Sequence, residues 1–207
     1  MTASANLAAP GLTGRLVVGI GGTTRPGSSS ELAVRTVLDV TARAGAETAH
    51  FGGAFLSSLP LYAPENPDRT PAQRELVEAV RRADAVVIGS PGYHGGVSGL
   101  VKNALDLLED LRDDTRVYFD GRAVGCVVTA AGWQACGTTL AALRSVVHAM
   151  RGWPTPLGVT LNSRTATLFG PDGQCADPAA RDVLHALGTQ LVQFTAAMSA
   201  APALSAV

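Results

Sequence analysis

Hydroxyl and guanidinium side chains gather in one short glycine-containing segment, residues 21–30 (GGTTRPGSSS). The segment follows a run of Val and Ile and precedes a helical pattern, so we expect it to join a strand to a helix N-terminus. Glycines allow a tight turn that exposes backbone N–H groups, Arg25 adds a planar fork of donors, and a helix N-terminus favours an anion. The segment lacks the GK[ST] ending of a Walker A loop and the GxGxxG fingerprint. It predicts a phosphate cradle, and a polar turn with a serine N-cap is the alternative.

A second glycine-rich segment, residues 90–103 (SPGYHGGVSGLVKN), also follows an apolar run. Its glycines would let a flat aromatic ligand approach the backbone, whose N–H groups could donate to a flavin ring. Tyr93 could flank such a ring and His94 could line the pocket edge, although ordinary packing and an exposed loop position are the alternatives. Lys102 and Asn103 fall on the next helix, where we expect surface solvation or bracing of the helix to a loop.

A third segment of small residues, 129–137 (TAAGWQACG), ends another apolar run. Trp133 could cover the edge of a ring, stack across a subunit boundary or anchor a core. Cys136 has no base beside it in the sequence, so we expect an unreactive thiol.

The elements that must position these segments alternate along the chain. Strands are expected at residues 15–21, 47–51, 85–91, 122–131 and 157–161, and helices at 28–43, 71–83, 98–111, 138–150 and 178–197. Residues 54–71, rich in Pro, Ser and Asn, are expected to form a long loop beside a site or an interface. The alternation predicts an α/β fold, a five-stranded parallel sheet with helices on both faces. Ligands of such sheets lie beyond the carboxyl ends of the strands, so the three segments should meet there.

Composition excludes several classes of protein. Apolar residues make up 46% of the 207 residues, charged residues 16%, and the net charge is −1, which argues against disorder and against broad attraction for nucleic acid or an anionic membrane. Three cysteines without CxxC spacing argue against a disulfide framework or a metal site and favour reduced thiols in the cytoplasm. We find no secretory signal and no run of about 18 apolar residues. We expect a flexible leader at 1–14, one domain at 15–200 and a tail at 201–207.

The first segment, together with PGYHGGVSGLVKNALDLL, resembles the NADPH-dependent FMN reductase family, a flavodoxin-like group. That family typically carries GSxRxxS at the first loop and PxYxxxxxGxxKNxxD at the second. The resemblance covers about residues 15–163. Thr23 replaces the more usual serine and keeps the hydroxyl, whereas Ser30 stands where many relatives have asparagine.

The resemblance implies a three-layer flavodoxin-like sandwich that binds FMN and takes electrons from NADPH or NADH. By position, the FMN phosphate would be held by Thr23, Arg25, Ser28 and Ser30. The ring or ribityl chain would contact Pro91, Gly92, Tyr93, His94 and Gly95. The pocket would be completed by Thr129, Ala131, Gly132 and Trp133. Because the flavin carries the chemistry, no catalytic acid or base is assigned.

The expected function is an NAD(P)H-dependent FMN reductase. Residues 132–162 are longer and more aromatic than in short quinone reductases, which favours a reductase that supplies reduced flavin to a partner monooxygenase. A quinone, azo, nitro or metal-ion reductase is the alternative. A flavodoxin-type electron carrier is disfavoured by the net charge of −1, since such carriers are usually strongly acidic. A domain that has lost its cofactor is the remaining alternative. Relatives form dimers or tetramers, so we expect a homodimer or homotetramer.

Overall fold

The computed structural model describes residues 11–200, in which strands and helices alternate as the sequence predicts. Most of the expected leader and the whole expected tail, residues 1–10 and 201–207, lie outside the described residues. The leader does not extend to residue 14, because Leu12 is 1% exposed and its backbone N–H donates to the Ala44 carbonyl at 2.7 Å. The strands are β1 (Leu16–Gly21), β2 (Glu47–Phe51), β3 (Ala85–Tyr93), β4 (Gly96–Val97), β5 (Ala123–Ala130), β6 (Trp153–Pro154) and β7 (Val159–Asn162). The helices are α1 (Ser29–Arg43), α2 (Gly53–Ser58), α3 (Pro71–Arg82), α4 (Gly99–Asp106), the 3₁₀ helix η1 (Leu107–Leu111), α5 (Trp133–Ala149) and α6 (Pro178–Ala200).

The sheet confirms the predicted α/β class and differs from it in strand count. Its order is β2-β1-β3-β5, with β6 and β7 both paired to β5, and every pairing is parallel except that of β3 with β4. The sheet has seven strands instead of the five expected. Pro154 and Pro156 interrupt the last strand position, because proline has no N–H for the ladder. If β6 and β7 are counted as one position and the β4 hairpin strand is set aside, the sheet has five positions. Numbered along the chain, their order is 2-1-3-4-5, which is the order of flavodoxin-like sheets, and the switch point lies between β1 and β3.

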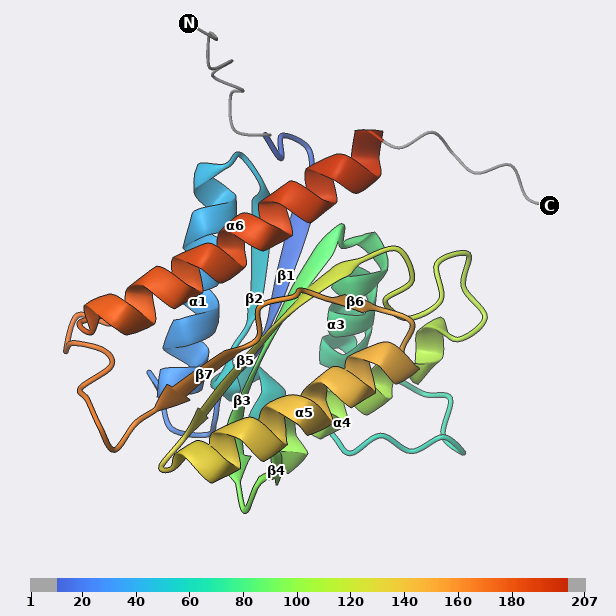
Figure 1. The fold of residues 1–207 in the computed structure, drawn as a ribbon. Helices are drawn as coiled ribbons and strands as arrows, with labels where there is room; N and C mark the ends of the chain where they lie inside the picture. Colours follow the sequence, from blue (N-terminus) through green and yellow to red (C-terminus); the bar gives the residue numbers. More distant parts are fainter. Residues whose placement is uncertain (1–10, 201–207) are drawn as a thin grey trace, which may run out of the picture.

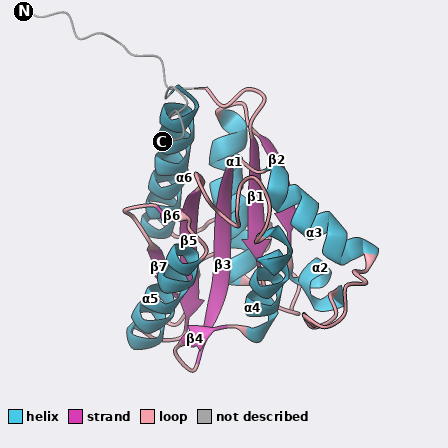
Figure 2. Ribbon diagram, turned by 90° about the vertical axis from the view of Figure 1, so that its right-hand side faces the viewer, coloured by secondary structure: helices cyan, strands magenta, loops and turns pink. Residues whose placement is uncertain are grey.

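Helices cover both faces of the sheet, as Figures 1 and 2 show. One face buries a core under α1 and α6, and the other buries a core under α3, α4 and α5. On the first face, glycines stand where a side chain would collide with a helix. A Cβ at Gly19 would lie 2.6 Å from Val34 of α1, and one at Gly89 would lie 2.8 Å from the Ser30 carbonyl. These glycines bring the first turn of α1 directly onto the strands beside the site.

Two stretches differ from the sequence expectation. The expected loop at 54–71 begins with the short helix α2, and α5 begins at Trp133 instead of residue 138. In the second case Gly137 hid the helical pattern, since glycine disfavours helix interiors and the first turn of α5 is rich in small residues. Within residues 11–200, no helix combines the length and the apolar character that crossing a bilayer requires.

Candidate active site

The carboxyl ends of β1, β3 and β5 meet at one cavity of about 490 Å³. This volume lies within the range of small-molecule sites, roughly 300–1,000 Å³. The lining residues come from the loop after β1, the first turn of α1, the end of β3, the end of β5 and the turn after β7. They are Thr23, Thr24, Arg25, Ser28, Ser29, Ser30, Pro91, Gly92, Tyr93, His94, Thr129, Ala130, Ala131 and Ser163.

The N-terminus of α1 opens onto this cavity without a side-chain cap. Ser28 occupies the N-cap position, but its Oγ accepts the Thr23 backbone N–H at 3.2 Å, and no other described side chain caps the helix. By contrast, Thr70 and Gln73 form a complete capping box on α3. Ser28 therefore holds the predicted N-cap position without making the capping hydrogen bond. The first-turn N–H groups of α1 remain available to an anion, and the exposed Arg25 stands beside them.

A tight turn at the end of β3 presents the second predicted segment. Tyr93 pairs with Gly96 across a two-residue connection, and both connecting residues have positive φ, 53° at His94 and 79° at Gly95. These are the signs required by a type I′ hairpin turn. The Ser90 hydroxyl joins the two ends of this hairpin by accepting a hydrogen bond from the Ser98 backbone N–H at 3.0 Å. Tyr93 is 60% exposed at the cavity mouth, so it is not buried under the loop.

Gly92 lines the cavity, yet its missing side chain would point at α5. A Cβ there would lie 2.9 Å from the Thr139 hydroxyl, 3.0 Å from the Ala130 Cβ and 3.1 Å from the Ala135 carbonyl. The glycine is therefore required by the close approach of β3 to α5. The structure therefore explains Gly92 by its packing against α5 and not by the space that a ligand ring needs.

The third segment divides between the cavity and another surface. Thr129 and Ala131 line the cavity, and Gly132 is the N-cap of α5, again with no side-chain cap from the described residues. Trp133 is 60% exposed and lines a separate cavity of about 300 Å³ with Leu161 and Val183. The first turn of α5 turns the indole away from the cavity at the ends of β1 and β3.

Ten of the thirteen predicted site residues line the main cavity: Thr23, Arg25, Ser28, Ser30, Pro91, Gly92, Tyr93, His94, Thr129 and Ala131. Gly95, Gly132 and Trp133 are not among its lining residues. Sequence reasoning missed Thr24, Ser29, Ala130 and Ser163. The first three lie inside the predicted segments. Ser163 could not be found by motif, since its Oγ reaches the site by donating to the Ala130 carbonyl at 3.3 Å across 33 residues.

Asn103 braces a loop, as the sequence predicts. Its side-chain oxygen accepts the Tyr62 backbone N–H at 2.8 Å, and its nitrogen donates to the Pro60 carbonyl at 3.0 Å. Lys102 forms an exposed ion pair with Asp106 one turn along α4. Asn103 thus holds the segment after α2 against α4, and neither residue lines the main cavity.

The three cysteines lie in the described part of the chain and are buried there as free thiols. Burial raises the pKa of Cys126 to about 12 and raises the pKa values of Cys136 and Cys175. A high pKa keeps a thiol protonated near neutral pH, where it is a poor nucleophile. The cysteines therefore give no sign of thiolate chemistry.

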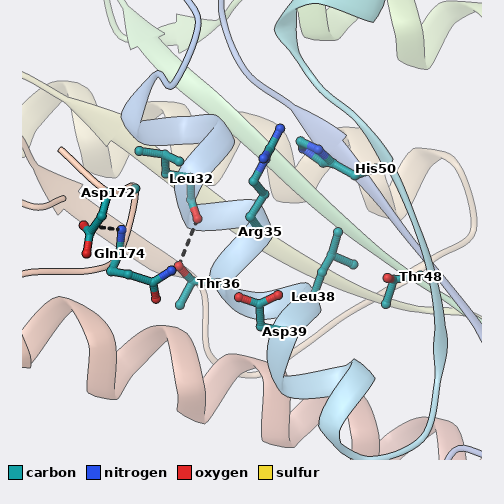
Figure 3. A pocket seen from close by; sticks show the side chains of 10 residues that line it. Leu32, Arg35, Thr36, Leu38, Asp39, Thr48, His50, Asp172 and Gln174 are labelled. Atoms are coloured by element: carbon teal, nitrogen blue, oxygen red, sulfur yellow. Dashed lines mark hydrogen bonds between the residues drawn. The ribbon is translucent and has the colours of Figure 1, made fainter. Parts of the chain in front are cut away.

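Another cavity, of about 510 Å³, lies between the outer side of α1, β2 and residues 172–174. Figure 3 shows Arg35 and His50 next to each other on its wall. Burial lowers the pKa of His50, the Arg35 charge lowers it further, and Glu31 opposes the shift. No predicted site residue lines this cavity.

Comparison with known families assigns the chain to one of them. Residues 16–166 match the family described as NADPH-dependent FMN reductase. The chain belongs to this family. The resemblance found in the sequence is thereby confirmed.

Individual relatives match this chain over a short segment or at low sequence identity. An FMN-dependent NADPH-azoreductase of Staphylococcus aureus is 34% identical over 83 residues, and that segment spans only 40% of each chain. The flavoenzyme NAD(P)H:(acceptor) oxidoreductase FerB from Paracoccus denitrificans superposes with a TM-score of 0.68 at 17% identity, over 87% of this chain and 97% of that one. A WrbA-like flavodoxin from Agrobacterium tumefaciens gives 0.59 at 14% identity, over 87% and 97% of the two chains. At these identities the solved structures show the shared flavodoxin-like fold.

Proposed function

We propose that this reductase binds FMN in the main cavity and oxidises NAD(P)H there. The observation that carries the proposal is the uncapped N-terminus of α1, which opens onto a cavity lined by hydroxyl groups and one guanidinium. The donor set fits a phosphate monoester. Helix N–H groups and Arg25 supply opposite charge, while Thr23 and Ser30 supply hydroxyl donors. The FMN phosphate would be held by Thr23, Thr24, Arg25, Ser28, Ser29 and Ser30.

The ring would lie against the end of β3 and the end of β5. Pro91, Gly92 and the turn at His94 offer a surface of backbone, and Tyr93 would flank the ring at the cavity mouth. Thr129 and Ala131 close the other side. Contacts from Gly95, Gly132 and Trp133 stay predictions.

The helix N-termini would bias the bound cofactor electrostatically. α5 begins next to Ala131 of the cavity lining and has no side-chain cap, so its first N–H groups would favour negative charge on a cofactor bound there. FMN, when bound, supplies the redox chemistry by accepting hydride from the nicotinamide and passing electrons to an acceptor. The chain's own part is to bind, to orient the ring and to leave one face open to the donor. No side chain is assigned as acid or base.

The candidate functions differ in the electron acceptor. The length and aromatic content of residues 132–162 support a reductase that feeds free reduced flavin to a partner monooxygenase. The similarity to the Staphylococcus aureus azoreductase supports an azo acceptor instead. We also propose a homodimer or homotetramer located in the cytoplasm. The buried reduced thiols support the cytoplasm, and the low charged fraction supports a buried interface.

The test is a titration of the purified full chain with FMN, followed by NADPH and NADH oxidation with and without FMN. We expect a flavin spectrum on binding and FMN-dependent oxidation of at least one donor. Rates with free FMN, benzoquinone and an azo dye then identify the acceptor class. A protein that binds FMN but oxidises neither donor is an electron carrier, and one that binds no FMN has lost the cofactor.

A matched pair of variants tests the placement of the phosphate. Arg25→Ala should weaken FMN binding about 10- to 100-fold, because charge-assisted hydrogen bonds are lost. Arg43→Ala removes an exposed arginine from the other end of α1 and should leave the affinity unchanged. Equal affinities in both variants would place the phosphate elsewhere.

A further inference from the structure

Glu31 is a charged residue in the first turn of α1, yet it is only 8% exposed. Buried carboxylates are rare unless they are paired. This one lies in the same helical turn that presents its N–H groups to the main cavity, although Glu31 does not line that cavity. Neither the family motif nor the proposed phosphate contacts account for it.

The carboxylate fits between two backbone segments. Its Oε2 accepts the Gly53 backbone N–H in a long hydrogen bond of 3.4 Å, and its Oε1 accepts from Arg35 Nη2 at 3.0 Å. A Cβ on Gly22 would lie 3.3 Å from Oε2, and one on Gly52 would lie 3.0 Å from Oε1. The carboxylate therefore bonds to the turn between β2 and α2 and lies close to Gly22 in the loop after β1.

The turn between β2 and α2 also supports the loop after β1, where we place the FMN phosphate. A Cβ on Gly53 would lie 1.7 Å from the Thr23 carbonyl oxygen, so the backbones of Gly53 and Thr23 are in direct contact. The Thr23 N–H donates to Ser28 Oγ, which is the contact that leaves α1 uncapped. A chain of contacts thus runs from Glu31 through Gly53 and Thr23 to Ser28.

We propose that Glu31 is a positioning residue for the anion cradle, with Arg35 as its neutralising partner. The inference rests on the proposed FMN binding. Glu31 Oε2 accepts the Gly53 N–H, and so fixes the turn whose backbone contacts Thr23. Its negative charge is unfavourable beside a phosphate, since like charges repel strongly where solvent is excluded. Arg35 offsets that charge from the outer cavity, where Figure 3 shows it beside His50.

The experiment measures FMN and riboflavin dissociation constants of the full chain and its variants by flavin fluorescence at low salt. Glu31→Ala removes the acceptor for Gly53, so FMN binding should weaken about tenfold while riboflavin, which lacks the phosphate, changes less than about twofold. Glu31→Gln keeps an acceptor oxygen and loses the charge, so FMN should bind at least as tightly as in the wild type. Arg35→Met removes the partner of the carboxylate. Because the Arg35 side chain is 58% exposed, water screens this ion pair, and FMN binding should weaken about two- to fivefold.

The double variant Glu31→Gln with Arg35→Met supplies the decisive comparison. It should restore wild-type FMN affinity, because no buried charge is left to compensate. Asp39→Asn is the matched control: it removes an exposed carboxylate from the same helix, beside the same outer cavity, and should change FMN affinity less than about twofold.

The outcomes separate this inference from the proposed function. If the wild type binds FMN and Glu31→Ala leaves its affinity within about twofold, the inference is wrong and the function stands. The inference is also wrong if the double variant binds FMN no more tightly than Arg35→Met does. It is wrong again if Glu31→Ala weakens the binding of FMN and of riboflavin equally, which indicates a general role in folding. Only a wild type that binds no FMN overturns both.

Discussion

The Oγ of Ser28 lies 3.2 Å from the backbone nitrogen of Thr23 and accepts its hydrogen. The residue at the N-cap position of α1 thus shapes the preceding loop and leaves the helix end open. We therefore expect Ser28→Ala to loosen the loop and weaken FMN binding about three- to tenfold, the effect of one neutral hydrogen bond.

Fluorescence titration with FMN measures this change. Thr189→Ala on α6 removes a hydroxyl whose hydrogen bond within residues 11–200 is to the His185 carbonyl, so it serves as the control. Tighter FMN binding in Ser28→Ala would show that the hydroxyl competes with the phosphate.

Gly92→Ala should destabilise the fold through α5. The added Cβ would meet Thr139 and Ala135 at 2.9 Å and 3.1 Å, which forces the helix away from β3. Overpacking of this kind costs about 1–3 kcal/mol of unfolding free energy, measured by urea unfolding without flavin. Gly99→Ala is the control, since nothing lies within 4 Å of a Cβ there. Unchanged stability together with lost FMN binding would instead mean that the methyl group meets the ring.

Arg122 should be a structural residue whose loss weakens the whole fold. It is 0% exposed and donates to the carbonyls of Ala83, Tyr118 and Arg81 at 2.8, 2.8 and 2.7 Å. Burial lowers its pKa to about 10, which reports the cost of burying the charge. Arg122→Met leaves buried carbonyls without this donor, so we expect a loss of about 2–4 kcal/mol by urea unfolding.

Arg122 lies at the opposite end of β5 from the site, so the folded fraction of Arg122→Met should bind FMN normally. Arg43→Ala, on an exposed helix end, is the stability control. A stability equal to that of the wild type would contradict the role of Arg122.

His50 should make the protein less stable in mild acid. Its pKa is lowered in the folded state, chiefly by burial, while the unfolded chain takes up a proton near its ordinary pKa of about 6.5. As the pH falls below about 6.5 the unfolded state binds more protons, so stability falls until the pH passes below the folded pKa. Lowering the pH from 7.5 to 5 should therefore lower the Tm of the wild type more than that of His50→Gln. The exposed His148→Gln should follow the wild type, and parallel curves for all three proteins would exclude His50 as the cause.

The sequence by itself determined the layered fold and the place of the site. Continuous Val and Ile runs separated by helical patterns require a parallel sheet buried on both faces, because only such a sheet buries both sides of each strand. Carboxyl ends of parallel strands share one edge, so residues 21–30 and 90–95 had to meet there. Ten predicted residues line one cavity for this reason.

The tertiary structure alone decided which way side chains face and which distant residues join the site. Trp133 begins α5, and the helix turns the indole toward Leu161 and Val183. Ser163 reaches the cavity because β7 pairs with β5, and Glu31 bonds to Gly53, which lies 22 residues away in the sequence. Local pattern specifies the conformation of a segment, but contacts between segments depend on how close the backbones come. Here the glycines of β1, β3 and the β2–α2 turn allow the backbones to come close. Their role depends on which helix or loop packs against each of them, and the sequence does not give that.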